Sequence, residues 1–165
     1  MLTRVTLDTN TMPVDDWISP IDRSKFQFAV VSVTAEEMKG TSYAVYLAPL
    51  EQVEKNTAYG AGVYGAGPYG GTIDKECIRR ALTIITGGSF TDPDRVVGLS
   101  GGELRQRRDA EIICVHARER RDIFVTRDEK GFVRGGRRAL LESEYGTTIM
   151  TPDEFVSAFA EGPAA

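Results

Sequence analysis

Four acidic side chains, far apart in the chain, occupy positions that a structural role explains poorly. Asp8 ends the segment LTRVTL, and Glu37 lies in TAEEMKG after an apolar run, with Glu36 beside it as the alternative. Asp109 begins a helical stripe of apolar residues, and Asp128 follows the apolar segment DIFVT. Carboxylates that converge repel each other and raise each other's pKa unless a cation lies between them. Mg²⁺ and Mn²⁺ prefer such oxygen ligands, so this set predicts a divalent-cation site.

A divalent cation held by three or four carboxylates polarises a phosphoryl oxygen and activates water, which suits phosphodiester hydrolysis. Each acid also has a structural alternative that the sequence leaves open. Asp8 could form an Asx-turn, Glu37 could belong to a capping box that starts at Thr34, and Asp128 could be a turn residue. Asp109 is harder to explain in this way. The stripe that it heads continues through Ile112, Ile113 and His116, and we expect a structural role for that single histidine.

The elements that must position these acids alternate between strands and helices. Strands are predicted at 2–7, 26–33, 122–126 and 147–150. Helices are predicted from Thr34 to about Gly40 and at 43–57, 73–86, 101–120, 136–144 and 151–159. This order is typical of an α/β fold with a mostly parallel sheet, and we expect a single domain over 1–165. Because ligands of such sheets bind at the carboxyl ends of the strands, the four acids should meet there.

The segment YGAGVYGAGPYGG, residues 59–71, is too rich in glycine to hold a regular element. Its tyrosines at 59, 64 and 69 are evenly spaced and could stack on unpaired bases. A solvent-exposed loop is the more common meaning of such a sequence. The prediction is therefore a loop, and its role stays open.

The stretch LSGGELRQRRD, residues 99–109, is similar to the signature segment of ABC-transporter ATPases. Such ATPases need a phosphate-binding loop that contains a Gly-Lys dipeptide, which this sequence lacks. Ser100 and Glu103 instead form a capping-box pattern, so LSGGE predicts the start of a helix.

Charge and cysteine content place limits on location and partners. The net charge is −4, yet residues 101–140 hold 11 basic and 7 acidic side chains. Nine arginines of this basic band could contact phosphate, and a solvated helix face is the alternative. They are Arg105, Arg107, Arg108, Arg118, Arg120, Arg121, Arg134, Arg137 and Arg138, of which the first three are the candidate RNA contacts. No apolar run is long enough to span a membrane. Cys77 and Cys114 show no metal-binding spacing, so we expect reduced thiols in a cytoplasmic protein.

Taken together, these segments resemble the PIN-domain family of metal-dependent nucleases, which includes VapC-type toxins. The resemblance covers VTLDTN, VVSVTAEEMKG, DAEIICVHA, DIFVTRDEKGF and TTIMTPDEFVSAF. Its most specific part is Thr126, Asp128 and Phe132 after a helix headed by an Asp. It implies an α/β/α sandwich, cleavage of RNA with Mg²⁺ or Mn²⁺ to leave a 5′-phosphate and a 3′-hydroxyl, and a homodimer.

The resemblance also implies roles for individual residues. Asp8, Glu37, Asp109 and Asp128 are the implied catalytic and metal-binding acids, and Glu37 is favoured over Glu36 because an apolar residue follows it. Asn10 and Thr126 are the implied partners that orient those acids. The segment between Gly40 and Asp109 is longer than in a compact VapC-type toxin. A ribonuclease is therefore implied more directly than a toxin with an antitoxin partner.

Three hypotheses follow for the function. The leading one is a Mg²⁺- or Mn²⁺-dependent endoribonuclease, as a candidate toxin of a toxin–antitoxin pair. The alternative is a non-catalytic PIN-like module that binds RNA or a protein. A HAD-type phosphatase is disfavoured because its nucleophile is followed two residues later by a second acid, where this chain has Asn10.

Overall fold

A computed structural model describes residues 1–54 and 74–160, and its strands form one parallel sheet. The strands are β1 (Thr3–Leu7), β2 (Phe26–Val31), β3 (Glu51–Val53), β4 (Ile123–Val125) and β5 (Thr148–Met150), in the spatial order β3-β2-β1-β4-β5. Every neighbouring pair is parallel, and Val5 at the centre lies opposite both Phe28 and Ile123. The predicted α/β class with a parallel sheet is confirmed.

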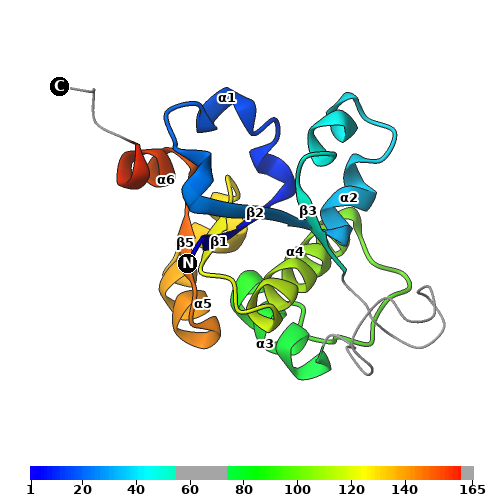
Figure 1. Cartoon of the computed structure of the whole chain (residues 1–165). Helices are drawn as coiled ribbons and strands as arrows, with labels where there is room; N and C mark the ends of the chain where they lie inside the picture. Colours follow the sequence, from blue (N-terminus) through cyan, green and yellow to red (C-terminus); the bar gives the residue numbers. More distant parts are fainter. Residues whose placement is uncertain (55–73, 161–165) are drawn as a thin grey trace.

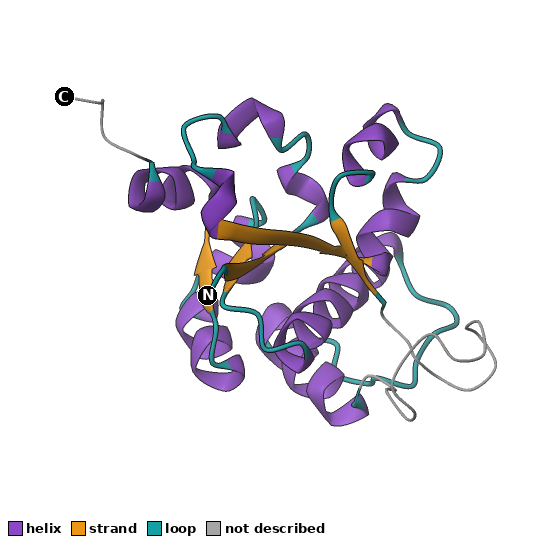
Figure 2. Cartoon of the chain, in the orientation of Figure 1, coloured by secondary structure: helices purple, strands orange, loops and turns teal. Residues whose placement is uncertain are grey.

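Helices cover both faces of this sheet and make an α/β/α sandwich, as Figures 1 and 2 show. One layer contains α3 (Lys75–Thr86), α4 (Gly101–Arg118) and α5 (Arg137–Tyr145), and the other contains α1 (Asp15–Ile18) and α6 (Pro152–Phe159). Successive strand residues serve opposite layers. On β4, Phe124 packs in the core cluster of α3 and α4, whereas Ile123 and Val125 pack in the cluster of α1 and α6.

Two predicted capping boxes are present, and each fixes where a helix begins. The Ser100 hydroxyl accepts from the Glu103 backbone N–H, and the Glu103 carboxylate accepts from the Ser100 N–H. Thr151 and Glu154 make the same reciprocal pair at the start of α6, with Pro152 in its first turn. Helix α4 therefore starts where LSGGE predicts, and this start sets the position of Asp109, nine residues after Ser100, at the sheet edge.

The predicted capping box at Thr34 is wrong. The strand ends at Val31, and α2 (Ser32–Met38) begins directly after it, so Thr34 lies inside the helix. Its buried hydroxyl lies 3.2 Å from the Thr9 hydroxyl instead of capping the backbone. Glu37 is consequently free of any capping role, and the predicted strand 26–33 is two residues too long.

The predicted helix over 43–57 is also wrong in the part that the structure describes. Residues Ser42–Leu47 form a 3-10 helix, and Glu51–Val53 form the edge strand β3. Pro49 explains the difference, because a proline lacks the N–H that a continuing helix needs. The other short helical turns are Thr9–Thr11, Arg23–Lys25 and a π-helical turn at Glu129–Val133.

Cys77 and Cys114 are joined by a disulfide, so the prediction of two reduced thiols is wrong. The bond links α3 to α4 within the core cluster. The two cysteines lie 37 residues apart in sequence, and only the packing of the two helices brings them together. The predicted cytoplasmic location loses the support that it drew from reduced cysteines.

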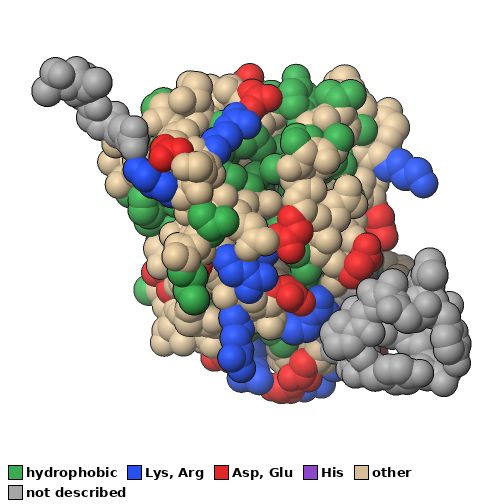
Figure 3. Space-filling model, viewed as in Figure 1, with side chains coloured by type: hydrophobic (Ala, Val, Ile, Leu, Met, Phe, Trp, Pro, Cys, Tyr) green, Lys and Arg blue, Asp and Glu red, His purple; other side chains and the backbone are tan. Residues whose placement is uncertain are grey.

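Within residues 1–54 and 74–160, no helix has the length and apolar character of a membrane span. The predicted loop at 59–71 lies outside the described residues. On the face drawn in Figure 3, acidic and basic side chains are interspersed.

Candidate active site

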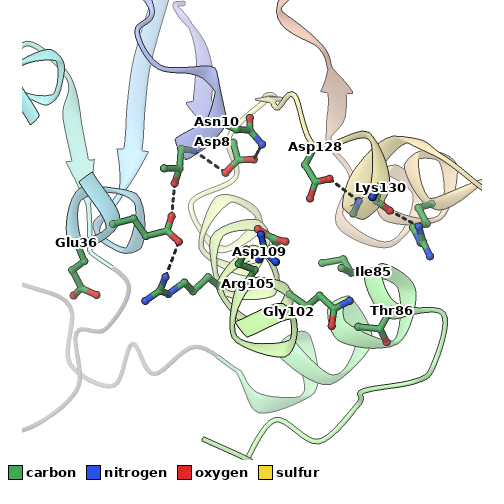
Figure 4. A pocket seen from close by; sticks show the side chains of 16 residues that line it. Asp8, Asn10, Glu36, Ile85, Thr86, Gly102, Arg105, Asp109, Asp128 and Lys130 are labelled. Atoms are coloured by element: carbon green, nitrogen blue, oxygen red, sulfur yellow. Dashed lines mark hydrogen bonds and ion pairs between the residues drawn. The ribbon is translucent and has the colours of Figure 1, made fainter. Parts of the chain in front are cut away.

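The four predicted acids line one pocket at the carboxyl ends of β1, β2 and β4 (Figure 4). Asp8 follows β1, Glu37 lies on α2 after β2, Asp128 follows β4, and Asp109 lies on α4, which packs beneath them. The remaining polar lining includes Thr9, Asn10, Glu36, Arg105, Arg108, Lys130 and Arg137. The parallel order of the strands thus brings to one edge residues that are up to 120 positions apart in sequence.

Asp8 is the most firmly held of the acids. Its carboxylate accepts hydrogen bonds from the Thr9 N–H at 2.8 Å, the Asn10 amide at 2.8 Å and the Thr126 hydroxyl at 2.7 Å. Burial, with smaller contributions from the charges of Asp128 and Glu37, raises the pKa of Asp8 to about 6, against the lowering effect of the hydrogen bonds from Thr126 and Thr9. Asn10 and Thr126 thus lie where the resemblance implies.

Those two partners are themselves fixed by the segment that follows β4. The Asn10 amide oxygen accepts from the Arg127 N–H at 2.7 Å, and the Thr126 hydroxyl accepts from the Asp128 N–H at 3.0 Å. Because Thr126 donates to Asp8 and accepts from the Asp128 backbone, it sets the positions of two acids at once.

Asp109 differs from Asp8, because among the described residues no hydrogen bond or ion pair reaches its carboxylate. Burial, together with the charges of Asp8, Asp128 and Glu37, raises the pKa of Asp109 to about 9, against a smaller opposing effect of Arg105. A partly buried carboxyl that faces three other acids without a donor is a group that a cation would stabilise.

Glu37 is held at both oxygens. Oε2 accepts a hydrogen bond from the Thr9 hydroxyl at 2.5 Å, and Oε1 lies 3.1 Å from Nη1 of Arg108. Figure 4 shows the side chain of Glu36 pointing away from the three aspartates. The preference for Glu37 over Glu36 agrees with this placement.

The three arginines predicted to contact RNA separate into two groups. Arg105 and Arg108 line the pocket. Arg107 points elsewhere: it donates to the Pro93 carbonyl at 2.6 Å, lies 3.4 Å from Glu111, and is only 13% exposed. Elsewhere in the basic band, Arg121, Arg134 and Arg138 pair with Glu51, Glu129 and Glu154.

The acids suit a hard divalent cation in their chemistry, because all are oxygen donors and Asp109 has no partner among residues 1–54 and 74–160. Their present positions do not enclose an ion. In the part of the chain that the structure describes, no three Asp, Glu, His or Cys side chains are arranged to hold a metal. Glu37 is already paired with Arg108, so a cation would have to draw these side chains together.

Sequence reasoning did not single out Thr9, Lys130 and Gly131, which line the pocket, and it placed Arg137 only within the basic band. Lys130 and Gly131 carried a usable signal, since both lie within three residues of Asp128. Thr9 carried the same signal, since it follows Asp8 directly, but its hydrogen bond to Glu37 on α2 depends on the packing of separate elements. The expected structural role of His116 agrees with its position, buried between the Thr6 and Thr147 hydroxyls.

Comparison of the chain with protein-family models, curated proteins and solved structures returns no match.

Proposed function

We propose that this protein is a nuclease that requires Mg²⁺ or Mn²⁺ and hydrolyses phosphodiester bonds in RNA. The observation that carries the proposal is Asp109, a partly buried carboxyl with no partner in the described residues, facing Asp8, Asp128 and Glu37 in one pocket. A stable fold gains nothing from such a group, because an acid that is withdrawn from water without a partner costs free energy. A site that recruits a cation explains why it is there.

Asp8, Asp109, Asp128 and Glu37 are the residues that would hold the ion. Bound there, Mg²⁺ or Mn²⁺ supplies Lewis-acid polarisation of a phosphoryl oxygen and activation of water. Asn10 and Thr126 keep the Asp8 carboxylate aimed at the pocket through their hydrogen bonds. Thr126 also holds the backbone from which Asp128 extends.

Cationic side chains at the same pocket would bind the substrate backbone. Arg105, Lys130 and Arg137 line it together with the acids. Arg137 is anchored by bonds to the carbonyls of Ile84 and Lys130, so its charge is held at the rim. Phosphate oxygens match such donors, and contacts of this kind position a nucleic acid without reading its sequence.

The test is cleavage of labelled single-stranded RNA with Mn²⁺, Mg²⁺ or EDTA. We expect EDTA to abolish cleavage, and Asp109→Asn and Asp8→Asn to lower it by more than about 100-fold, since even partners of metal ligands cost 10- to 100-fold. Glu129→Gln is the matched control: this exposed acid lies next to Asp128 but pairs with Arg134. Cleavage by a folded Asp109→Asn protein at the wild-type rate would refute the proposal.

The choice of RNA rests on the resemblance alone, so single-stranded DNA of the same sequence is a second arm of the assay. We expect faster cleavage of the RNA, with 5′-phosphate products.

A non-catalytic PIN-like module is the second candidate, favoured by the absence of a preformed three-ligand arrangement among the described residues. It predicts RNA binding without turnover in either metal.

A further inference from the structure

Arg108 and Glu37 form an ion pair inside the pocket where the cation would bind. Nη1 of Arg108 lies 3.1 Å from Oε1 of Glu37, and the Thr9 hydroxyl occupies the other carboxylate oxygen. Arg108 comes from α4 and Glu37 from α2, 71 residues apart in sequence, so the pair exists only because these helices pack together. Both oxygens of one candidate ligand are therefore engaged before any ion arrives.

The neighbouring arginine in the same pocket behaves differently. Arg105 lies one turn before Arg108 on α4 and lines the same pocket. In residues 1–54 and 74–160, no ion pair joins Arg105 to an acid. Arg105 and Arg108 thus share a helix and a pocket, but only Arg108 contacts Glu37, so the contact is specific to Arg108.

We propose that the Arg108 guanidinium is a built-in counter-cation for Glu37, which a divalent ion must displace, so that Arg108 limits the affinity of the site for metal. This inference rests on the proposed function. Arg108 is a positioning residue here, because it acts on the ion through Glu37. Its side chain is 40% exposed, and that of Glu37 is 20% exposed, so the guanidinium has open solvent into which it can turn.

Displacement would have a second consequence. A divalent ion competes with Arg108 for the same oxygen of Glu37, and the two cations repel each other. The released guanidinium stays tethered beside the ion, and its planar donors fit a phosphodiester. Binding of the ion would thus supply an arginine for the substrate phosphate, which couples the two binding events.

The experiment is calorimetric titration of the whole chain with Mn²⁺, without any substrate. We expect Arg108→Gln to bind Mn²⁺ about 3- to 10-fold more tightly than the wild type, the range for loss of a partly exposed ion pair. Arg105→Gln is the matched control, because it removes the same charge from the same pocket without breaking an ion pair. The Mn²⁺ affinity of Arg105→Gln should rise clearly less than that of Arg108→Gln.

A double-mutant cycle separates the ion pair from the general field of the pocket. In a Glu37→Gln background, Arg108→Gln should change Mn²⁺ affinity no more than Arg105→Gln does. The rise in melting temperature that Mn²⁺ causes is an independent readout of the same series, and it should be largest for Arg108→Gln.

The outcomes distinguish this inference from the proposed function. Suppose that Asp109→Asn loses Mn²⁺ binding while Arg108→Gln binds no more tightly than the wild type. The counter-cation role is then refuted, and the metal site stands. Equal effects of Arg108→Gln and Arg105→Gln would refute it too. Absence of Mn²⁺ binding in every variant would overturn both.

Discussion

The backbone N–H of Gly131 donates a hydrogen bond of 3.0 Å to Oδ1 of Asp128, and the other oxygen of that carboxylate lies where a side chain on residue 131 would begin. A Cβ at this position would be 2.5 Å from Oδ2 of Asp128 and 3.7 Å from Oδ2 of Asp109. Two of the four acids therefore approach one glycine. The absence of a side chain at Gly131 leaves room for both carboxylates. A Cβ there would clash with Asp128 and would only touch Asp109.

Gly131→Ala should consequently displace the Asp128 carboxylate while leaving the fold intact, because the atom in conflict is the end of a movable side chain. We expect Mn²⁺ affinity to fall about 10-fold, the size of effect seen when a ligand loses its orientation. Calorimetric titration measures it. Gly101→Ala is the control, since a Cβ at that helical position meets nothing within 4 Å. Equal Mn²⁺ affinity in both variants would contradict the prediction.

The convergence of the four acids at one edge of the sheet could be predicted from the sequence, because it depends on local patterns in the chain. Asp8 and Asp128 each follow a short apolar strand, and in a parallel sheet such positions share one edge. Asp109 follows from the capping box at Ser100, which fixes the start of α4, and from the apolar stripe that orients the helix. None of these inferences needs contacts between distant side chains.

The remaining features depend on packing that no local pattern encodes. The pair between Arg108 and Glu37 and the disulfide between Cys77 and Cys114 each join separate helices. The edge strand β3 has the sequence Glu-Gln-Val with two exposed polar residues, so it lacks the apolar run that marks β4, a strand of the same length. Thr34 fits a capping box in sequence, yet the strand before it stops earlier and the hydroxyl turns toward Thr9 instead.

The raised pKa of Asp109 predicts how the stability of the metal-free protein depends on pH. The folded-state pKa is about 9 and the ordinary value is 3.8, so above 3.8 the unfolded chain releases a proton that the folded chain retains. The free energy of unfolding should therefore decrease as pH rises through this window. Asp109→Asn removes this pH dependence. As the pH rises from about 5 to 7, the free energy of unfolding of the variant should therefore increase by about 2 kcal/mol relative to that of the wild type.

Urea unfolding in EDTA at the two pH values measures this difference. Glu129→Gln is the control, because Glu129 is a neighbouring acid that lies outside the pocket lining. A difference between Asp109→Asn and the wild type that stays constant with pH would show that Asp109 ionises normally.

The buried His116 predicts a pH dependence of stability in the opposite direction, at acidic pH. Its Nδ1 lies 2.8 Å from the Thr6 hydroxyl and its Nε2 lies 2.6 Å from the Thr147 hydroxyl, so a neutral ring satisfies both. Burial, with smaller contributions from the charges of Arg121 and Arg4, lowers the pKa of His116 from an ordinary 6.5 to about 3. Below pH 6.5 the unfolded chain binds a proton that the folded chain does not bind. The free energy of unfolding therefore decreases as the pH is lowered.

His116→Leu should be less stable than the wild type at neutral pH, by about 1–3 kcal/mol, because two buried hydroxyls lose their partner. Between neutral pH and about pH 5, however, its stability should fall by about 2 kcal/mol less than that of the wild type. Urea unfolding at both pH values tests this. An equal loss in the two proteins would mean that His116 does not resist protonation.

The disulfide between Cys77 and Cys114 should contribute stability through the unfolded chain. It closes a loop across a sequence separation of 37 residues, which corresponds to about 3–4 kcal/mol from lost loop entropy. Dithiothreitol should then lower the melting temperature by about 10 °C, given the usual dependence for a chain of this size. The Cys77→Ala/Cys114→Ala variant should melt at the lower temperature with or without reductant. A wild-type protein whose thiol titration confirms the bond, yet whose melting is unchanged by reduction, would show that packing of α3 on α4 suffices.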